Sequence, residues 1–109
     1  MGSLLYGNNG IEIEFDDRAL AHLQIVITAK LRRRESFTFS WTSPPRSGGG
    51  RSAIWLDSTS VLYFRYLGSK MPSINRDWIT VLALSSNSAQ GLVFTTEPDA
   101  QTASTPSIP

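Results

Sequence analysis

The chain has 109 residues, 40% of them hydrophobic, and a formal net charge of only +1. A chain of this length forms one domain that buries roughly 65% of its unfolded surface, enough for a single core. It contains no cysteine, which excludes a disulfide framework, a zinc–thiolate site and a thiol nucleophile. No segment approaches the roughly 18 apolar residues of a membrane span, and the N-terminus lacks the pattern of a signal peptide. We therefore expect a soluble, cytoplasmic protein.

The beginning of the chain predicts a β-hairpin. Two short strand patterns, residues 3–6 and 11–15, flank residues 7–10, whose sequence GNNG tolerates the positive φ angles of a tight turn. Apolar and acidic residues alternate in the second strand. Its apolar side chains are therefore expected to face the core, with Glu12 and Glu14 in solvent rather than forming an acid/base pair.

Residues 17–33 predict an amphipathic helix, with Asp16 or Asp17 capping its first turn. Its apolar residues recur at spacings of three and four, so they share one face. They are Leu20, Leu23, Ile27 and Leu31, widened by Ala19 and Val26. The basic residues at the end of the helix suit the negative end of its dipole. His22 is expected to be a partly exposed helix residue without the partners that a general base needs.

After the predicted helix, the spacing of the apolar residues changes to every second residue. Residues 37–42 predict a strand with its aromatic side chains, Trp41 included, turned toward the core. Residues 43–50, SPPRSGGG, predict a mobile loop. Because this glycine run opens a strand rather than a helix, a flexible hairpin is favoured over a phosphate-binding loop. Residues 51–56 and 61–66 predict two more strands of an antiparallel meander. The second has large apolar groups on both faces, which favours a place in the middle of the sheet.

A second helix is predicted over residues 73–87, capped by Ser73. Its core positions are Ile74, Trp78 and Leu82. Residues 92–96 predict a last strand, and residues 98–109 a disordered tail, because their composition cannot offset the entropy of ordering. The sequence thus predicts one α+β domain over residues 1–97. Its elements follow the order β-β-α-β-β-β-α-β, in an antiparallel sheet of five or six strands with two helices on one face.

Charge is unevenly distributed, since six basic residues fall between positions 30 and 51 against one acidic residue, Glu35. Arginines contact phosphates, and flat aromatic rings stack on bases. The candidate anion-binding residues are Arg32, Arg33, Arg34, Arg46 and Arg51, and the candidate stacking residue is Trp55. The alternative is that these charges only reflect the preference of helix ends for cations. With one histidine and no cysteine, no catalytic residue, metal site or cofactor site is predicted.

Four segments carry a resemblance: LLYGNNGIEIEFDDRALAHLQ, KLRRRESFTFSW, GGRSAIWLD and INRDWI…LALSSNS…GL. Through them, roughly residues 1–97 resemble a family of small, uncharacterised actinobacterial proteins. This family looks like a domain of unknown function whose members often carry the label ATP-dependent DNA ligase. Such a ligase needs an adenylated lysine in a Lys-x-Asp-Gly setting, whereas Lys30 and Lys70 are followed by other residues.

The sequence therefore favours a non-enzymatic binding or regulatory domain whose basic-aromatic surface contacts nucleic acid or an acidic protein. Two alternatives stay open. One is a ligase-like or ligase-associated protein, as the family label suggests, and the other is a structural homo-oligomer.

Overall fold

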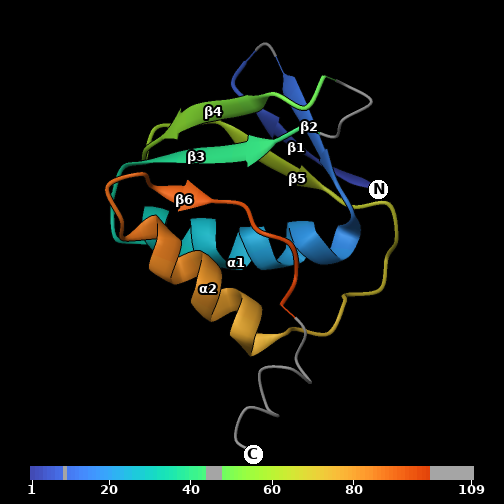
Figure 1. The fold of residues 1–109 in the computed structure, drawn as a ribbon. Helices are drawn as coiled ribbons and strands as arrows, with labels where there is room; N and C mark the ends of the chain where they lie inside the picture. Colours follow the sequence, from blue (N-terminus) through green and yellow to red (C-terminus); the bar gives the residue numbers. More distant parts are fainter. Residues whose placement is uncertain (9, 44–47, 99–109) are drawn as a thin grey trace, which may run out of the picture.

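A computed structural model describes residues 1–8, 10–43 and 48–98, and Figure 1 shows its arrangement. The elements are β1 (Gly2–Tyr6), β2 (Ile11–Phe15), α1 (Asp17–Arg32), β3 (Phe37–Thr42), β4 (Arg51–Leu56), β5 (Leu62–Arg65), α2 (Arg76–Ser86) and β6 (Leu92–Val93). The α+β class with two helices is confirmed. The single antiparallel sheet is wrong, because the strands form two three-stranded sheets, β2-β1-β5 and β4-β3-β6, and β6 pairs parallel to β3. Apart from Pro98, the expected tail lies outside the described residues.

β5 is the strand whose position was predicted least well. It pairs with β1, from Tyr6↔Leu62 to Ser3↔Arg65, and is an edge of its sheet rather than the middle. The meander is therefore also wrong, because the turn after β4 carries the chain from one sheet to the other. The aromatic residue that suggested a second covered face, Tyr63, is 56% exposed.

The two local predictions of the first half of the chain are accurate. β1 and β2 form the antiparallel hairpin, in the register Tyr6↔Ile11. Ile13 and Phe15 are buried as expected, whereas Ile11 lies next to the turn of the hairpin and is exposed. α1 is capped by Asp16, whose carboxylate accepts the Ala19 N–H, and its predicted face is core.

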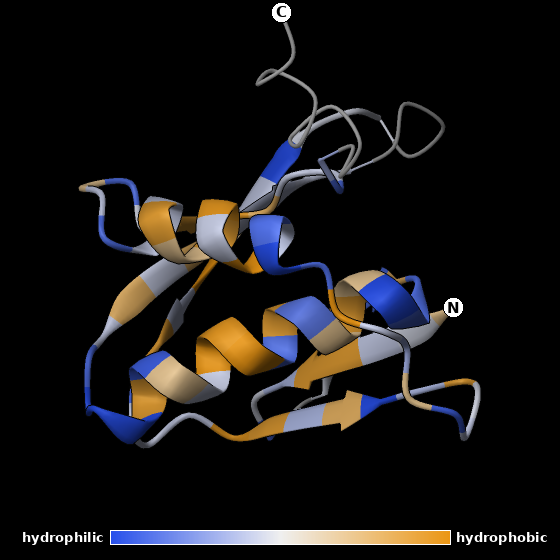
Figure 2. Ribbon diagram, turned by 90° about the horizontal axis from the view of Figure 1, so that it is seen from below, coloured by the Kyte–Doolittle hydropathy of each residue, from blue (hydrophilic) through white to orange (hydrophobic). Residues whose placement is uncertain are grey.

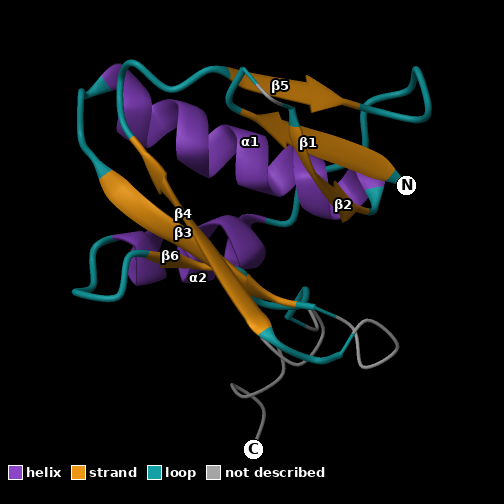
Figure 3. Ribbon diagram, turned by 90° about the horizontal axis from the view of Figure 1, so that it is seen from above, coloured by secondary structure: helices purple, strands orange, loops and turns teal. Residues whose placement is uncertain are grey.

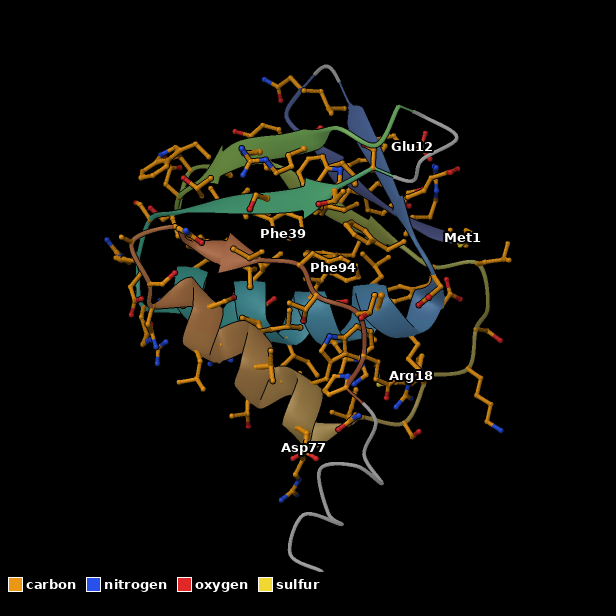
Figure 4. The ribbon with its side chains drawn as sticks, in the orientation of Figure 1. Met1, Glu12, Arg18, Phe39, Asp77 and Phe94 are labelled. Atoms are coloured by element: carbon orange, nitrogen blue, oxygen red, sulfur yellow. The ribbon has the colours of Figure 1, made fainter. Side chains whose placement is uncertain are left out.

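The helices lie together on one side of the two sheets, as the views from below and above show (Figures 2 and 3). α1 packs on β1 and β2, and α2 packs on α1 and β6. Between the sheets and the helices lies an aromatic core in which Phe15 is 6.1 Å from Phe39 and 5.0 Å from Phe94, measured between ring centroids. Figure 4 shows Phe39 and Phe94 pointing into this space.

α2 begins later than predicted. Asn75, not Ser73, is its N-cap and accepts N–H groups of Asp77 and Trp78. Trp78 and Leu82 are buried as predicted, but Ile74 precedes the helix and is 40% exposed. The carboxamide of Asn75 accepts from the first turn in an extended backbone conformation, so it stops the helix from extending toward Ser73.

His22 is fully buried, so its expected partial exposure is wrong. Its Nδ1 is 2.7 Å from the Arg18 carbonyl oxygen, and its Nε2 accepts the Asn75 N–H at 2.8 Å. The ring also packs on Trp78, with centroids 4.6 Å apart. Both nitrogens are satisfied within the fold, so His22 joins α1 to the start of α2 and is not free for catalysis.

A surface network continues from this junction to the last described residues. The Arg18 guanidinium donates to both carboxylate oxygens of Glu97, at 2.8 and 2.7 Å. The Asn75 side chain donates to the same carboxylate at 2.8 Å. These hydrogen bonds, that of Arg18 first, lower the pKa of Glu97 to about 2. They fasten the end of the described chain to α1 and to the N-cap of α2.

Candidate functional site

The basic end of α1 is formed by Arg32, Arg33 and Arg34, all of which are exposed. Arg33 is the C-cap, and Arg34 follows it in the left-handed region with a φ of 59°. The Arg34 N–H donates to the Leu31 carbonyl, which is a common way of ending a helix. Glycine is the usual residue at this position, because a Cβ there costs roughly 1–2 kcal/mol. The chain therefore keeps a charged side chain at a backbone position that disfavours it.

Lys30 does not belong to this surface, although it is close in sequence. It is 5% exposed, and its ammonium group donates to the Asn87 side-chain oxygen at 2.8 Å and pairs with Glu35 at 2.5 Å. Glu35 also pairs with Arg33 at 3.0 Å. The hydrogen bond from Lys30, followed by the charges of Lys30 and Arg33, lowers the pKa of Glu35. Within residues 1–8, 10–43 and 48–98, Arg32 and Arg34 have no such ion pair.

The β3–β4 hairpin separates the other candidates. Arg51 pairs with Thr42 at one end of the hairpin, whereas Phe37, which closely follows the basic end, pairs with Leu56 at the other. The two ends are about 17 Å apart at the usual rise of a strand. Trp55 is 54% exposed and pairs with Thr38 near the end of β4, where it lines a depression with Tyr6, Asn8 and Asp57.

The structure therefore brings together only part of the predicted surface. Arg32, Arg33 and Arg34 lie together at the end of α1, whereas Trp55 lines a separate depression with Tyr6, Asn8 and Asp57. Arg51 lies at the other end of the hairpin, and Arg46 falls outside the described residues. Trp41, on the opposite face of β3 from Thr38, packs against the core as predicted. The predicted basic-aromatic surface is smaller than the sequence suggested, because the strands between its members are extended.

A groove of about 420 Å³ runs along the exposed side of α1, and the sequence did not reveal it. It lies between α1 and the segment that leads from β5 to α2, because both contribute lining residues. Its lining residues are Ala21, Gln24, Ile25, Thr28, Ala29, Arg32, Tyr66, Met71 and Ile74. Three of them are exposed apolar side chains: Ile25 at 42%, Met71 at 81% and Ile74 at 40%. The available sequence signal was Ile25, an apolar residue outside the core stripe of the helix.

The remaining sequence candidates have structural roles. Glu12 accepts from Ser3 at 2.6 Å and pairs with Arg65 at 3.1 Å across the sheet. Gly48 and Gly49 adopt positive φ angles in the connection between β3 and β4, where no helix follows to form a phosphate-binding loop. In the described parts of the chain, no three His, Cys, Asp or Glu side chains gather as metal ligands would.

Fold and surface define a small α+β domain with an exposed basic helix end beside an apolar groove. Residues 1–97 match the family described as "Domain of unknown function (DUF7882)", and the chain belongs to this family. Comparisons with curated proteins and with solved structures gave no match. Neither described helix has the length and apolar character needed to span a membrane.

Proposed function

We propose that this protein is a small non-enzymatic binding or regulatory domain that contacts an anionic partner through the basic end of α1. One observation carries the proposal. Arg32 and Arg34 are exposed and have no ion-pair partner within the described ranges, and Arg34 retains its side chain in a left-handed backbone conformation. Backbone strain retained at an exposed charged residue is typical of functional sites.

Two kinds of partner share the required chemistry. Arginine forms paired hydrogen bonds with phosphates and with carboxylates, so both nucleic acid and an acidic protein suit it. Trp55 supports nucleic acid as a separate contact point on β4, because an exposed indole can stack on a base. With Arg51 far away and Arg33 paired to Glu35, two or three arginines remain available. Binding to nucleic acid is therefore expected to be weak.

The test is direct binding of the protein to a single-stranded oligonucleotide, a duplex oligonucleotide and polyglutamate. About 50 mM salt leaves phosphate contacts little screened. The double variant Arg32→Ser/Arg34→Ser should lose binding. The matched control Arg51→Ser removes an exposed arginine at the far end of the hairpin and should bind like the wild type. Two or three phosphate contacts should weaken nucleic-acid binding roughly seven- to fortyfold between about 50 and 200 mM salt.

Two outcomes contradict the proposal. If none of the three polyanions binds, the arginines are a solvated helix end and nothing more. If Arg51→Ser weakens binding as much as the double variant, the attraction comes from overall charge and not from the basic end of α1.

The resemblance found in the sequence implies a ligase-like enzyme instead, and the surroundings of the lysines argue against it. Lys30 is buried and bound to Glu35 and Asn87, so its nitrogen has no access to a nucleotide phosphate. Lys70 is exposed in the segment between β5 and α2, without the flanking residues that hold an adenylate. Incubation with labelled ATP and magnesium should leave the protein unlabelled. A stable adduct on either lysine restores the enzymatic interpretation.

Two expectations from the sequence remain proposals. Residues 1–97 form the domain and residues 98–109 a dispensable tail, so truncation after Pro98 should leave the melting temperature unchanged. The protein works in the cytoplasm, which cell fractionation tests.

A further inference from the structure

The groove beside α1 combines an apolar floor with cationic ends. The α1 side of the groove runs from Ala21 to Arg32 and is about 16 Å long at the rise of an α-helix. Small residues at Ala21 and Ala29 let another backbone approach closely, and Ile25 stands between them. This spacing of four residues is the one at which a second helix packs its side chains.

The opposite wall of the groove is partly fixed and partly adaptable. Tyr66 is held in place because its hydroxyl donates to the Gln24 side-chain oxygen at 2.6 Å. Met71 and Ile74 complete this wall, and Met71 is 81% exposed. A methionine side chain adapts to apolar surfaces of different shape, so the wall can close over an inserted leucine or isoleucine.

All charged groups that line the groove and its two neighbouring depressions are basic. Arg32 lines the groove itself, and Lys70 lines the depression beyond Ala21. Lys30 and Arg33 line the depression between α1 and α2, but both pair with Glu35, so the positive charge of the groove comes from Arg32 and Lys70. No carboxylate among the described residues lines any of the three. Asp17, near the Lys70 end, accepts the Leu67 and Gly68 N–H groups at 3.0 and 2.8 Å.

We infer that this groove binds the apolar face of an acidic amphipathic helix supplied by a partner protein. The inference rests on the proposed function, since Arg32 belongs both to the basic end of α1 and to the groove. Apolar anchors at spacings of three and four enter between Ile25, Met71 and Ile74, and flanking carboxylates meet Arg32 and Lys70. Helix-in-groove recognition of this kind relies on the same spacing in other proteins.

The charge pattern favours this occupant over a second copy of the chain. In a two-fold symmetric dimer the same surface meets itself. Antiparallel pairing of the α1 faces sets the Arg32 end of one copy against the Lys70 end of the other, which brings like charges together. Nucleic acid satisfies the cations but leaves Ile25, Met71 and Ile74 without apolar contacts.

The test titrates isotope-labelled protein with a synthetic helix of about 15 residues, a length at which isolated helices are marginally stable. The peptide carries leucines at spacings of three and four and glutamates elsewhere. Two matched peptides replace either the leucines by serine or the glutamates by lysine. The acidic leucine peptide should shift the amide signals of Ala21, Ile25 and Ala29. The serine peptide should bind at least tenfold more weakly, and the lysine peptide should not bind.

Two isoleucine variants distinguish binding in the groove from nonspecific hydrophobic binding. Ile25→Gln should weaken binding of the acidic leucine peptide at least tenfold. Ile11→Gln changes an isoleucine of similar exposure, 52% against 42%, on the distant hairpin and should have no effect. Circular dichroism confirms that both variants fold.

Failure of the groove inference is distinguishable from failure of the proposed function. If Arg32→Ser weakens peptide binding but Ile25→Gln does not, or if oligonucleotides bind and neither acidic peptide does, the groove inference is wrong and anion binding stands. If no peptide, no oligonucleotide and no polyglutamate binds, both are wrong. A dimer in sedimentation equilibrium that Ile25→Gln dissociates assigns the groove to a second copy and overturns the inference.

Discussion

Replacement of Arg34 by glycine should stabilise the domain while weakening its binding to anions. Arg34 has a φ of 59°, in the region where a Cβ crowds the neighbouring carbonyl. Its side chain makes no hydrogen bond or ion pair within residues 1–8, 10–43 and 48–98, so its removal costs no such interaction in the described fold. The variant therefore exchanges a functional side chain for relief of backbone strain.

The magnitude follows from two opposing terms. Relief of the left-handed conformation contributes roughly 1–2 kcal/mol to the free energy of unfolding. The greater conformational freedom of glycine in the unfolded chain reduces this gain by about 0.4–1 kcal/mol. The net gain lies between about 0 and 1.6 kcal/mol, and its midpoint of about 0.8 kcal/mol corresponds to a rise in melting temperature of roughly 3–6 °C for a domain of this size.

Thermal unfolding followed by circular dichroism measures the gain, with Arg33→Gly as the matched control. Arg33 has a φ of −91°, so glycine relieves no strain there and should lower the melting temperature. Arg34→Ala removes the charge but keeps the strain, so it should lose anion binding without becoming more stable. A fall in melting temperature for Arg34→Gly, or an equal rise for Arg33→Gly, refutes the reasoning about strain.

Three further predictions concern the fold. Ile27→Ala should lower the free energy of unfolding by roughly 2–5 kcal/mol in a denaturant titration, because Ile27 is 0% exposed on the core face of α1, and a loss below about 1 kcal/mol contradicts that burial. Gly91→Ala should lower the free energy of unfolding by at least about 2 kcal/mol, because Gly91 has a φ of 79° and a Cβ there overlaps the Thr38 carbonyl oxygen. A melting temperature equal to that of the wild type excludes this close approach. The pKa of Glu97 is lowered from 4.5 to about 2, so its stabilising effect is complete above pH 4.5 and is lost as the pH falls toward 2. The loss should be only about 1 kcal/mol, because the pair with Arg18 is partly exposed and screened, and Glu97→Gln should remove this part of the pH dependence.

Whether the candidate binding residues form one surface depends on distances between them that the sequence does not contain. Lys30 and Arg51 count equally as basic residues in the sequence, yet one is buried in an ion pair and the other lies at the far end of a hairpin. The Ile25 groove was missed for a related reason. Its opposite wall comes from Met71 and Ile74, which reach α1 only through the path of the chain after β5.

The sequence by itself determined which segments become helices and strands and, for α1 and β3, which face is buried. The 3.6-residue period of α1 and the twofold period of β2 and β3 are local properties, so Leu23, Ile27 and Phe39 could be assigned to the core from spacing alone. Only the tertiary structure decided which strands pair, because periodicity says that a face is covered but not what covers it. The pairing of β5 with β1, the burial of His22 against Asn75 and the groove beside α1 all arise from contacts between segments more than forty residues apart.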